Sequence, residues 1–533
     1  MTTLPPLLDR KRGLGLAAVA TLTVVQGAAA GAAAFATRSL FEAMHGGAAL
    51  PVAELAVLVA AGAVIAITRV VSRQLGERIG QDYARQIRTA LFEHAARMPA
   101  RAVAARRAGY MSLRFVGDMT AFRNWLGLGL PRLIAAGVLI PAMLLVLWLL
   151  DPVFALGVTP IFALCLAMIA WGGLRLVSLQ RRLRARRARI AAEMAERMPM
   201  APHLDRLGRR GKELGLLDKR TDAMVRAALA HRFGVESLKA LPDVAAGIAA
   251  AVVILAGYQA GLGTGSIAAA LAALGLLLSP LRDLGGVWNH RAAYRAAAIK
   301  AEAALSRARR DVYRGGKSLP KGGVEVVFED VALSSGRQLS FRAEGGKATA
   351  LALGELDGEA VIDMLLGLDS PQSGAILLSG IDLRNLSRGT LRRDVLRIGT
   401  MPGILQGSLR RALVMGCDVR PDDDALTELA HEAGLSALLD RVGGLDGTVL
   451  EGGKNLALAE RLAISLVRIQ LLRPRLVLLG PDISDALANR LVSELALKNR
   501  TLIRIQAHAQ DAPPASDVDG TASTQDAESR PFC

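Results

Sequence analysis

Cysteine is scarce in this sequence of 533 residues, and charge is missing from long parts of it. The three cysteines, Cys165, Cys417 and Cys533, lie far apart and follow no metal-ligand spacing. Neither a disulfide framework nor a cysteine metal site is therefore expected. We predict no metal site elsewhere in the chain.

The uncharged stretches are long and apolar, and they cover residues 13–37, 55–68, 133–150, 152–174 and 244–281. A membrane helix needs about 20 mainly apolar residues, so the last stretch has room for two. A cleaved signal peptide is a poorer interpretation of the first one, because it is long and the next follows closely. We predict six membrane helices, near 14–36, 52–71, 131–150, 152–174, 240–260 and 266–287.

The charge that is present is mainly positive, with a formal net charge of +17. Basic residues concentrate in 69–126 and 175–235, whereas the alternate loops are short and nearly neutral. The positive-inside tendency then predicts a multi-pass protein of the inner or plasma membrane, with these segments and both termini in the cytoplasm. Basic segments beside membrane helices explain the charge, so we predict contact with membrane lipid and no nucleic-acid partner.

The periodicity of the sequence changes near Val324. Before it, the basic segments keep apolar residues at helical spacing, as in Ile79, Tyr83 and Ile87. After it, short apolar runs alternate with helical stretches, and these runs are 324–333, 347–355 and 475–480. We predict a six-helix membrane domain over 1–317, an α/β domain over 318–510 and a disordered tail over 511–533.

Several stretches in this order resemble an ABC exporter half-subunit, over nearly the whole chain to about His508. They are "GERIGQDYARQIRTALFEHAARMP", "GYMSLRFVGDMTAFRN", "LGLDSPQSGAILLSGIDLRNLSRGTLRR", "GSLRRAL" and "GLDGTVLEGGKNL". The resemblance implies an all-α membrane domain with long intracellular extensions, followed by an α/β P-loop-like ABC domain. It also implies a dimer, with ATP and Mg²⁺ as the cofactors of the family.

The phosphate-binding motif of that family is degraded here. A P-loop, GxxxxGK[ST], holds phosphates with backbone N–H groups and a Lys, and its hydroxyl binds Mg²⁺. The matching stretch is "LGELDGEAVID", in which Gly354 and Gly358 are remnants, the Lys position falls on Glu359 and the hydroxyl position on Ala360. Exchanging Lys for Glu at about 4 Å from a phosphate replaces roughly 4 kcal/mol of attraction by repulsion. Phosphate binding is therefore expected to fail.

The strand that should carry the metal-binding and catalytic acids has lost both. In "RLVLLGPDIS" the Asp position falls on Gly480 and the general-base Glu position on Pro481. Asp482 and Asp485 follow, but a shift of two residues past a proline misplaces them for attack on phosphate. We expect them to be solvated turn or helix-capping groups.

The remaining motifs of the family are altered as well. The adenine-stacking aromatic maps to Ser335, and the Q-loop Gln maps to Thr400, with Gln406 at a nonfunctional position. His508 lies one residue away from the spacing of the switch histidine. The signature LSGGQ reads "LALAE", which is Leu456, Ala457, Leu458, Ala459 and Glu460.

These helix formers predict an ordinary packed helix after the signature position. Its expected apolar face consists of Leu458, Leu462, Leu466 and Ile469.

An ABC ATP site is composite, because one domain supplies the P-loop and its partner supplies the signature. This chain lacks both halves, so neither a homodimer nor a pair with an intact subunit has a complete site. The resemblance therefore implies a pseudo-ATPase exporter subunit without ATP or Mg²⁺, which contributes membrane helices beside an intact half-transporter. Two alternatives remain: a scaffold or regulator that docks through the inactive domain, and an ATPase that uses unusual residues.

The sequence does not identify the transported cargo. The spans consist largely of Ala, Leu, Gly and Val, which favours an apolar or peptide cargo, although such spans also simply pack closely. Gln26 and Tyr258 are expected to be packing or interface residues.

Overall fold

A computed structural model describes residues 4–47, 49–104, 118–333, 335–399, 403–418, 421–496 and 500–507. The chain divides into two compact units. The first comprises Met1–Arg97 with Ala104–Ala308, and the second comprises Met98–Val103 with Arg309–Cys533. The main division thus falls at 308/309, compared with 317/318 as expected from the sequence. The tail over 511–533 lies outside the described residues.

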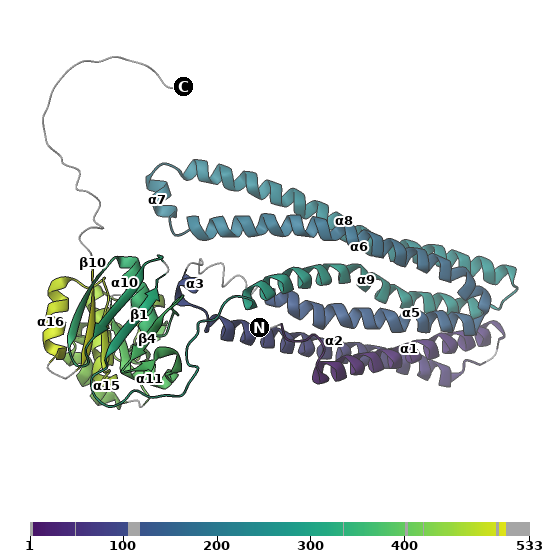
Figure 1. Ribbon diagram of the computed structural model, residues 1–533. Helices are drawn as coiled ribbons and strands as arrows, with labels where there is room; N and C mark the ends of the chain where they lie inside the picture. Colours follow the sequence, from purple (N-terminus) through teal and green to yellow (C-terminus); the bar gives the residue numbers. More distant parts are fainter. Residues whose placement is uncertain are drawn as a thin grey trace, which may run out of the picture. The chain divides into compact units, whose positions relative to one another are not determined.

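The first unit consists of long helices (Figure 1). These are α1 (Arg10–His45), α2 (Val52–Ala95), the π-helical turn η1 (Trp125–Gly129), α5 (Leu130–Leu150), α6 (Pro152–Arg197), α7 (Ala201–Arg206), α8 (Arg210–Gln259) and α9 (Thr264–Leu305). Six helices in the described part of the chain are long and apolar enough to cross a membrane. They contain the six predicted spans, which are thereby confirmed. Phe154, Phe162 and Leu277 are among the fully buried side chains of their common core.

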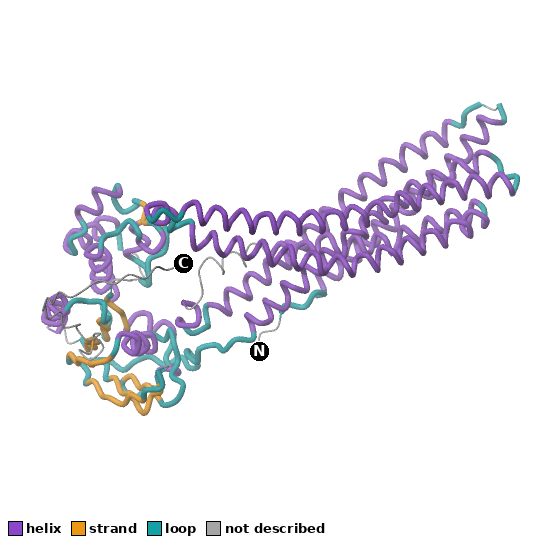
Figure 2. Tube along the Cα trace, turned by 90° about the horizontal axis from the view of Figure 1, so that it is seen from above, coloured by secondary structure: helices purple, strands orange, loops and turns teal. Residues whose placement is uncertain are grey.

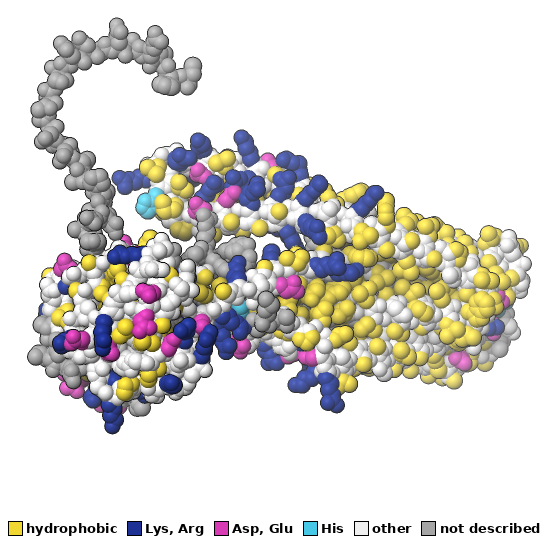
Figure 3. Space-filling view, in the orientation of Figure 1, with side chains coloured by type: hydrophobic (Ala, Val, Ile, Leu, Met, Phe, Trp, Pro, Cys, Tyr) yellow, Lys and Arg dark blue, Asp and Glu magenta, His cyan; other side chains and the backbone are white. Residues whose placement is uncertain are grey.

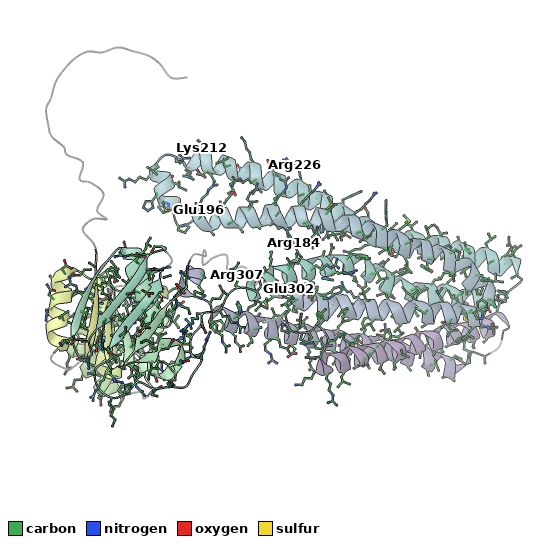
Figure 4. All side chains as sticks on the ribbon, in the orientation of Figure 1. Arg184, Glu196, Lys212, Arg226, Glu302 and Arg307 are labelled. Carbon is green, nitrogen blue, oxygen red and sulfur yellow. The ribbon has the colours of Figure 1, made fainter. Side chains whose placement is uncertain are left out.

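The helices continue well beyond the apolar stretches, as the periodicity predicts. Helix α2 extends to Ala95 and α6 to Arg197. An ion pair between Arg197 Nη1 and Glu213 Oε2 (3.1 Å) joins α6 to α8 beyond the apolar stretches, and Arg220 pairs with Glu193. Dark-blue Lys and Arg side chains gather over these extensions, whereas the other end of the helices is largely apolar (Figure 3). Arg184, Lys212 and Arg226 are labelled on the extensions of α6 and α8 (Figure 4).

Helix α2 approaches η1 so closely that no side chain fits between them. A Cβ atom at Gly76 would lie 2.5 Å from the carbonyl oxygen of Gly127, and one at Gly80 would lie 2.5 Å from that of Arg123. Gly76 and Gly80 form a small-xxx-small pair, the pattern that allows helix backbones to touch. The crossing fixes the part of α2 that precedes it, including Arg73, against the start of α5.

All strands of the described chain lie in the second unit (Figure 2). One sheet has the order β2–β1–β4–β5 and is antiparallel, with β1 (Val326–Ala332), β2 (Gln338–Ala343), β4 (Ala375–Leu378) and β5 (Ile381–Asp382). The other has the order β3–β10–β9–β6 and is parallel, with β3 (Ala348–Leu353), β6 (Val395–Ile398), β9 (Leu476–Leu479) and β10 (Thr501–Ala507). A small pair consists of β7 (Gly407–Ser408) and β8 (Thr448–Val449). The predicted α/β architecture is confirmed.

Strand β9, inside the parallel sheet, is buried on both faces, since every one of its side chains is fully buried. The helices of this unit are α10 (Glu355–Leu365), η2 (Leu383–Asn385), α11 (Arg388–Asp394), α12 (Leu409–Leu413), α13 (Asp423–Glu432), α14 (Ser436–Val442), η3 (Glu451–Gly453), α15 (Leu458–Leu472) and α16 (Asp485–Ala496). Buried residues of α10 join both sheets in one core. Continuous apolar strands of this kind are typical of parallel sheets covered on both sides.

The segment that follows α2 packs within the second unit. Here α3 (Ala100–Ala104) begins, and the amide of Ala100 donates to the carbonyl oxygen of Leu368 (2.9 Å). Arg101 Nε pairs with Asp369 Oδ2 (3.0 Å), whose side chain is buried.

The helix crossing yields a direct test of stability. Gly76→Ala places a methyl group against the Gly127 backbone, so we expect a loss of about 1–3 kcal/mol in the stability of the first unit. Gly62→Ala is the matched control on α2, because a Cβ there has nothing within 4 Å. The control should be neutral or gain up to about 1 kcal/mol from helix propensity. Thermal stability of the full chain in detergent measures both, and equal shifts would contradict the crossing.

Candidate functional site

The carboxyl edge of the parallel sheet is the candidate site. Strands β3, β6 and β9 end there and are followed by Gly354, Gly399 and Gly480, and open α/β sheets bind ligands at this edge. The fold thus brings together the stretches that the sequence analysis assigned to the phosphate loop and to the acidic strand.

No open loop follows β3. Helix α10 begins at Glu355, and the amide of Gly358 donates a helical hydrogen bond to the Gly354 carbonyl oxygen (2.8 Å). A Cβ at Gly358 would lie 2.4 Å from Cγ2 of Ile505, so this glycine serves close packing of α10 on β10. A helix N-terminus attracts anions, but the first turn here already holds Glu355 and Asp357.

Glu359, at the Lys position, binds an arginine of this chain. Arg397 in β6 donates to both Glu359 carboxylate oxygens, from Nη1 and from Nη2, each at 2.7 Å. Its Nη2 also lies 3.5 Å from Oδ1 of Asp482. Burial alone would lower the pKa of Arg397, but Glu359 and Asp482 raise it overall. One guanidinium thus joins α10, β6 and the residues after β9, in the fork geometry that suits carboxylates.

The network surrounds Gly480, the position predicted for the metal-binding Asp from the sequence. A Cβ at Gly480 would lie 2.2 Å from Asp482 Oδ1 and 3.1 Å from Arg397 Nη2. A Cβ at Gly399 would lie 2.9 Å from Arg397 Nε. The two glycines therefore leave room for an ion pair, and Pro481 turns the chain so that Asp482 reaches it. The edge is occupied rather than bare.

Asp363 lies one helical turn beyond Glu359. Burial, and then the negative charge of Glu359, raises the pKa of Asp363 to about 6, and Arg397 acts in the opposite direction. Glu359 and Asp363 lie on one face of α10 and share the single cation of Arg397, so Asp363 is shifted toward its neutral form.

Asp482 differs from the expectation of a solvated turn or capping group, whereas Asp485 is a solvated residue of the first turn of α16, with a side chain that is 85% exposed. Asp482 pairs with Arg397, and Asp485, at the start of α16, pairs with Arg504 of β10. Arg504 Nη1 also donates to Oδ1 of Asn489 (2.6 Å). Each carboxylate is engaged by an arginine that projects from the parallel sheet.

The signature segment forms the start of α15. Ala457 precedes the first turn, and its N–H donates to Oε2 of Glu460 (2.7 Å), which also pairs with Arg441 (2.7 Å). Ala459 is exposed. The predicted apolar face is wrong at Leu458, which is 56% exposed, because the helix buries Ala463, Ile464 and Val467 in one cluster and Ile469 in another.

The other expected positions are scattered or undescribed. Ser335 lies in an exposed turn after β1, where its Oγ accepts from the amide of Arg337 (3.4 Å). Ala360 is packed against the core of the second unit, and Gln406 is exposed. Thr400 and His508 lie outside the described residues.

Sequence reasoning missed Arg397 and Asp363. A signal for Arg397 exists in "DVLRIG", because a charge inside a short apolar strand needs a partner when it is buried. Nothing in the local sequence marks Asp363, whose pKa depends on neighbours brought close by folding.

Comparison with known proteins places the first unit in context. Residues 16–229 match the family model of the ABC transporter transmembrane region. The mycobactin import ATP-binding/permease protein IrtB of Mycolicibacterium thermoresistibile is 33% identical over 171 residues, 31% of this chain and 29% of that protein. The ATP-dependent lipid A-core flippase of Albidiferax ferrireducens is 24% identical over 305 residues, 54% of this chain and 52% of that protein. The chain spans about 26–52% of the length of such relatives.

The whole fold matches a solved exporter. The structure of a bacterial Atm1-family ABC exporter with ATP bound has a TM-score of 0.75 and covers 94% of this chain and 91% of its own, at 19% identity. The chain thus has the fold of an ABC exporter half-subunit. With six long apolar helices and the match over 16–229, it is a multi-pass membrane protein.

The shared guanidinium can be tested by a double-mutant cycle. Arg397→Gln leaves Glu359 and Asp482 without their cation, so we expect the second unit to lose about 1–3 kcal/mol. The loss stays below that of a fully buried pair because Glu359 is 37% exposed. Adding Glu359→Gln should recover part of it. Pulse proteolysis of the full chain in a urea series measures these changes, and simple additivity would argue against the pair.

Asp363 predicts a dependence of stability on pH. Its pKa of about 6 in the folded chain lies above the usual 3.8, so the unfolded chain releases this proton first. The stabilisation that this pKa shift adds to the folded state is therefore complete below pH 4. It is lost as the pH rises through 6, which lowers the free energy of unfolding by at most about 3 kcal/mol. Asp363→Asn should match the original chain near pH 4 and be more stable at pH 7. The same proteolysis series reads this difference, and a constant difference across pH would contradict the raised pKa.

Proposed function

We propose that this chain is a pseudo-ATPase membrane subunit of an ABC-type exporter. It contributes membrane helices to transport and works beside an intact half-transporter that hydrolyses ATP. The observation that carries the proposal is the Glu359–Arg397–Asp482 network at the edge of the sheet where a nucleotide would bind.

Electrostatics oppose a triphosphate at this edge. Glu355, Asp357 and Glu359 surround the start of α10, and each repels a phosphate at about 4 Å by roughly 4 kcal/mol at an effective dielectric constant of 20. Arg397 could attract phosphate only by leaving its two hydrogen bonds to Glu359. The helical turn from Gly354 to Gly358 also uses the backbone N–H that a phosphate-binding loop leaves free.

The partner side of a composite site is altered too. The signature stretch offers Ala457 and Leu458 in place of the hydroxyl and glycine backbone that hold a partner's nucleotide, and Glu460 adds a negative charge. A homodimer would then contain two incomplete sites, which favours an intact subunit as the functional partner. In this arrangement the basic extensions, both termini and the second unit face the cytoplasm.

Nucleotide binding by the purified full chain tests the loss of ATPase function. With Mg²⁺ and ATP up to millimolar concentrations, we expect neither saturable binding in calorimetry nor phosphate release. Gly358→Val is the control for contamination, because its side chain meets Ile505 and should disturb the start of α10. Hydrolysis by the original chain that disappears in this variant would refute the proposal. Hydrolysis that is equal in both would belong to a contaminant.

Purification of the tagged chain from its native membrane tests the partner. We expect an equimolar complex with a half-transporter whose phosphate loop, acidic strand and signature are complete, and cargo transport that stops when the partner's catalytic Glu is replaced. A stable homodimer without such a partner, insensitive to nucleotide, would instead indicate a scaffold or regulator.

A further inference from the structure

A cavity of about 130 Å³ among α1, α2, η1–α5 and α9 has a charged end. Arg69 and Arg73 of α2, Arg132 of α5 and Asp283 of α9 line it. Arg132 Nε lies 3.6 Å from Asp283 Oδ1, and its Nη1 lies 3.3 Å from His290 Nε2. Three guanidinium groups face one carboxylate, so the cavity has two positive charges in excess.

Two of these arginines, both exposed, have no partner among the described residues. In the part of the chain that the structure describes, neither Arg69 nor Arg73 makes a hydrogen bond or an ion pair, whereas neighbouring Arg123 lies 3.7 Å from Glu77. Their i, i+4 spacing places both on one face of α2, beside Ser72. A guanidinium fork matches a phosphate or a carboxylate, so this face is suited to an anion.

The rest of the wall carries no charge. Ile65, Leu139 and Met143 supply apolar surface, and Thr23 and Gln26 of α1 add uncharged polar groups. Gln26, expected to be a packing residue, thus faces the cavity. A ligand that fits both parts has an anionic head group joined to an apolar body.

The helix backbone is irregular where it borders the cavity. The π-helical turn η1 contributes Gly127 and runs into Pro131, and Pro280 interrupts α9. Because proline has no N–H, the carbonyl of Leu276, a residue that also lines the cavity, cannot receive the usual helical bond from residue 280. Such irregularity at membrane depth is tolerated where it is buried or lines a cavity, and π-turns are frequent at functional sites.

We propose that this cavity binds the anionic head group, phosphate or carboxylate, of an amphiphilic cargo. Arg69 and Arg73 bind the head group, and Asp283 positions Arg132. A cavity of about 130 Å³ is smaller than the roughly 300–1,000 Å³ of a complete ligand pocket, so it encloses the head group alone. The apolar or peptide cargo expected from span composition is replaced by an anionic one, since composition ignores charges at the ends of the spans.

Arginines near membrane edges also extend to lipid phosphates without forming a site. Here two helices direct arginines to one cavity, and the Gly76–Gly127 crossing holds them together. Because a cargo site presupposes the transport subunit proposed above, the assignment of the ligand as cargo rests on that function. Binding itself requires neither ATP nor a partner.

The test is equilibrium binding of a fluorescent short-chain phosphatidic acid to the full chain in phosphatidylcholine nanodiscs. A phosphatidylcholine probe with the same acyl chains is the neutral control. Replacing Arg69 and Arg73 by Gln should weaken binding by about tenfold for each arginine, because each loses a charge-assisted hydrogen bond. Arg78→Gln with Arg88→Gln is the matched control, since both are exposed on α2 away from the cavity. The control should change binding less than about twofold, because neither guanidinium touches the head group.

Competition distinguishes the sources of the anion. Displacement of the probe by phosphatidic acid but not by inorganic phosphate supports a lipid-like cargo. Equal displacement of the probe by both supports an anion site but contradicts the assignment of an amphiphilic cargo. Equal weakening by both pairs of substitutions, or equal binding of the neutral probe, overturns the site. Each of these negative outcomes of the binding test leaves the proposed function intact. ATP hydrolysis by the chain would overturn the proposed function without affecting the binding result.

Discussion

One guanidinium organises the edge of the parallel sheet. Arg397 projects from β6 and is held by Glu359 of α10 and by Asp482 after β9. The missing side chains at Gly399 and Gly480 follow from this arrangement, because a Cβ at either position would press on the ion pair. The raised pKa of Asp363 also follows, since one cation serves more than one acid. A buried charge is tolerated only when it is paired, and here the chain itself provides the partners.

The arginines of the two candidate sites differ in their partners. In the second unit, Arg397 pairs with Glu359 and Asp482, and Arg504 pairs with Asp485 and donates to Asn489. In the first unit, Arg69 and Arg73 face a cavity without a partner in the described part of the chain. Arginines that are paired within a domain stabilise its fold and are not free to bind an anion. Arginines without a partner favour anion binding. This contrast fits a subunit that contributes a path for cargo and leaves ATP hydrolysis to another chain.

The architecture of the α/β unit does not depend on the residues of its candidate site, and the physical reason is local. Strand β9 is stabilised by burial of Leu476, Val477, Leu478 and Leu479, none of which takes part in catalysis. Gly358 packs α10 on β10 whether or not a phosphate is bound. A fold whose stability depends on such contacts can lose its ligand-binding groups without unfolding.

The sequence by itself determined the six membrane helices, their extensions and the strands of the α/β unit, because uncharged length and apolar periodicity are local properties. Through the resemblance, it also predicted that Glu359 and Gly480 stand at the positions of a Lys and an Asp. Only the tertiary structure decided what occupies that edge, since Arg397 lies 38 residues from Glu359 and 85 from Asp482 along the chain. It likewise decided which face of α15 is buried, because two separate clusters meet that helix. The tertiary structure also decided the charged cavity, because its arginines come from α2 and α5, which the glycine contact of α2 with η1 brings together.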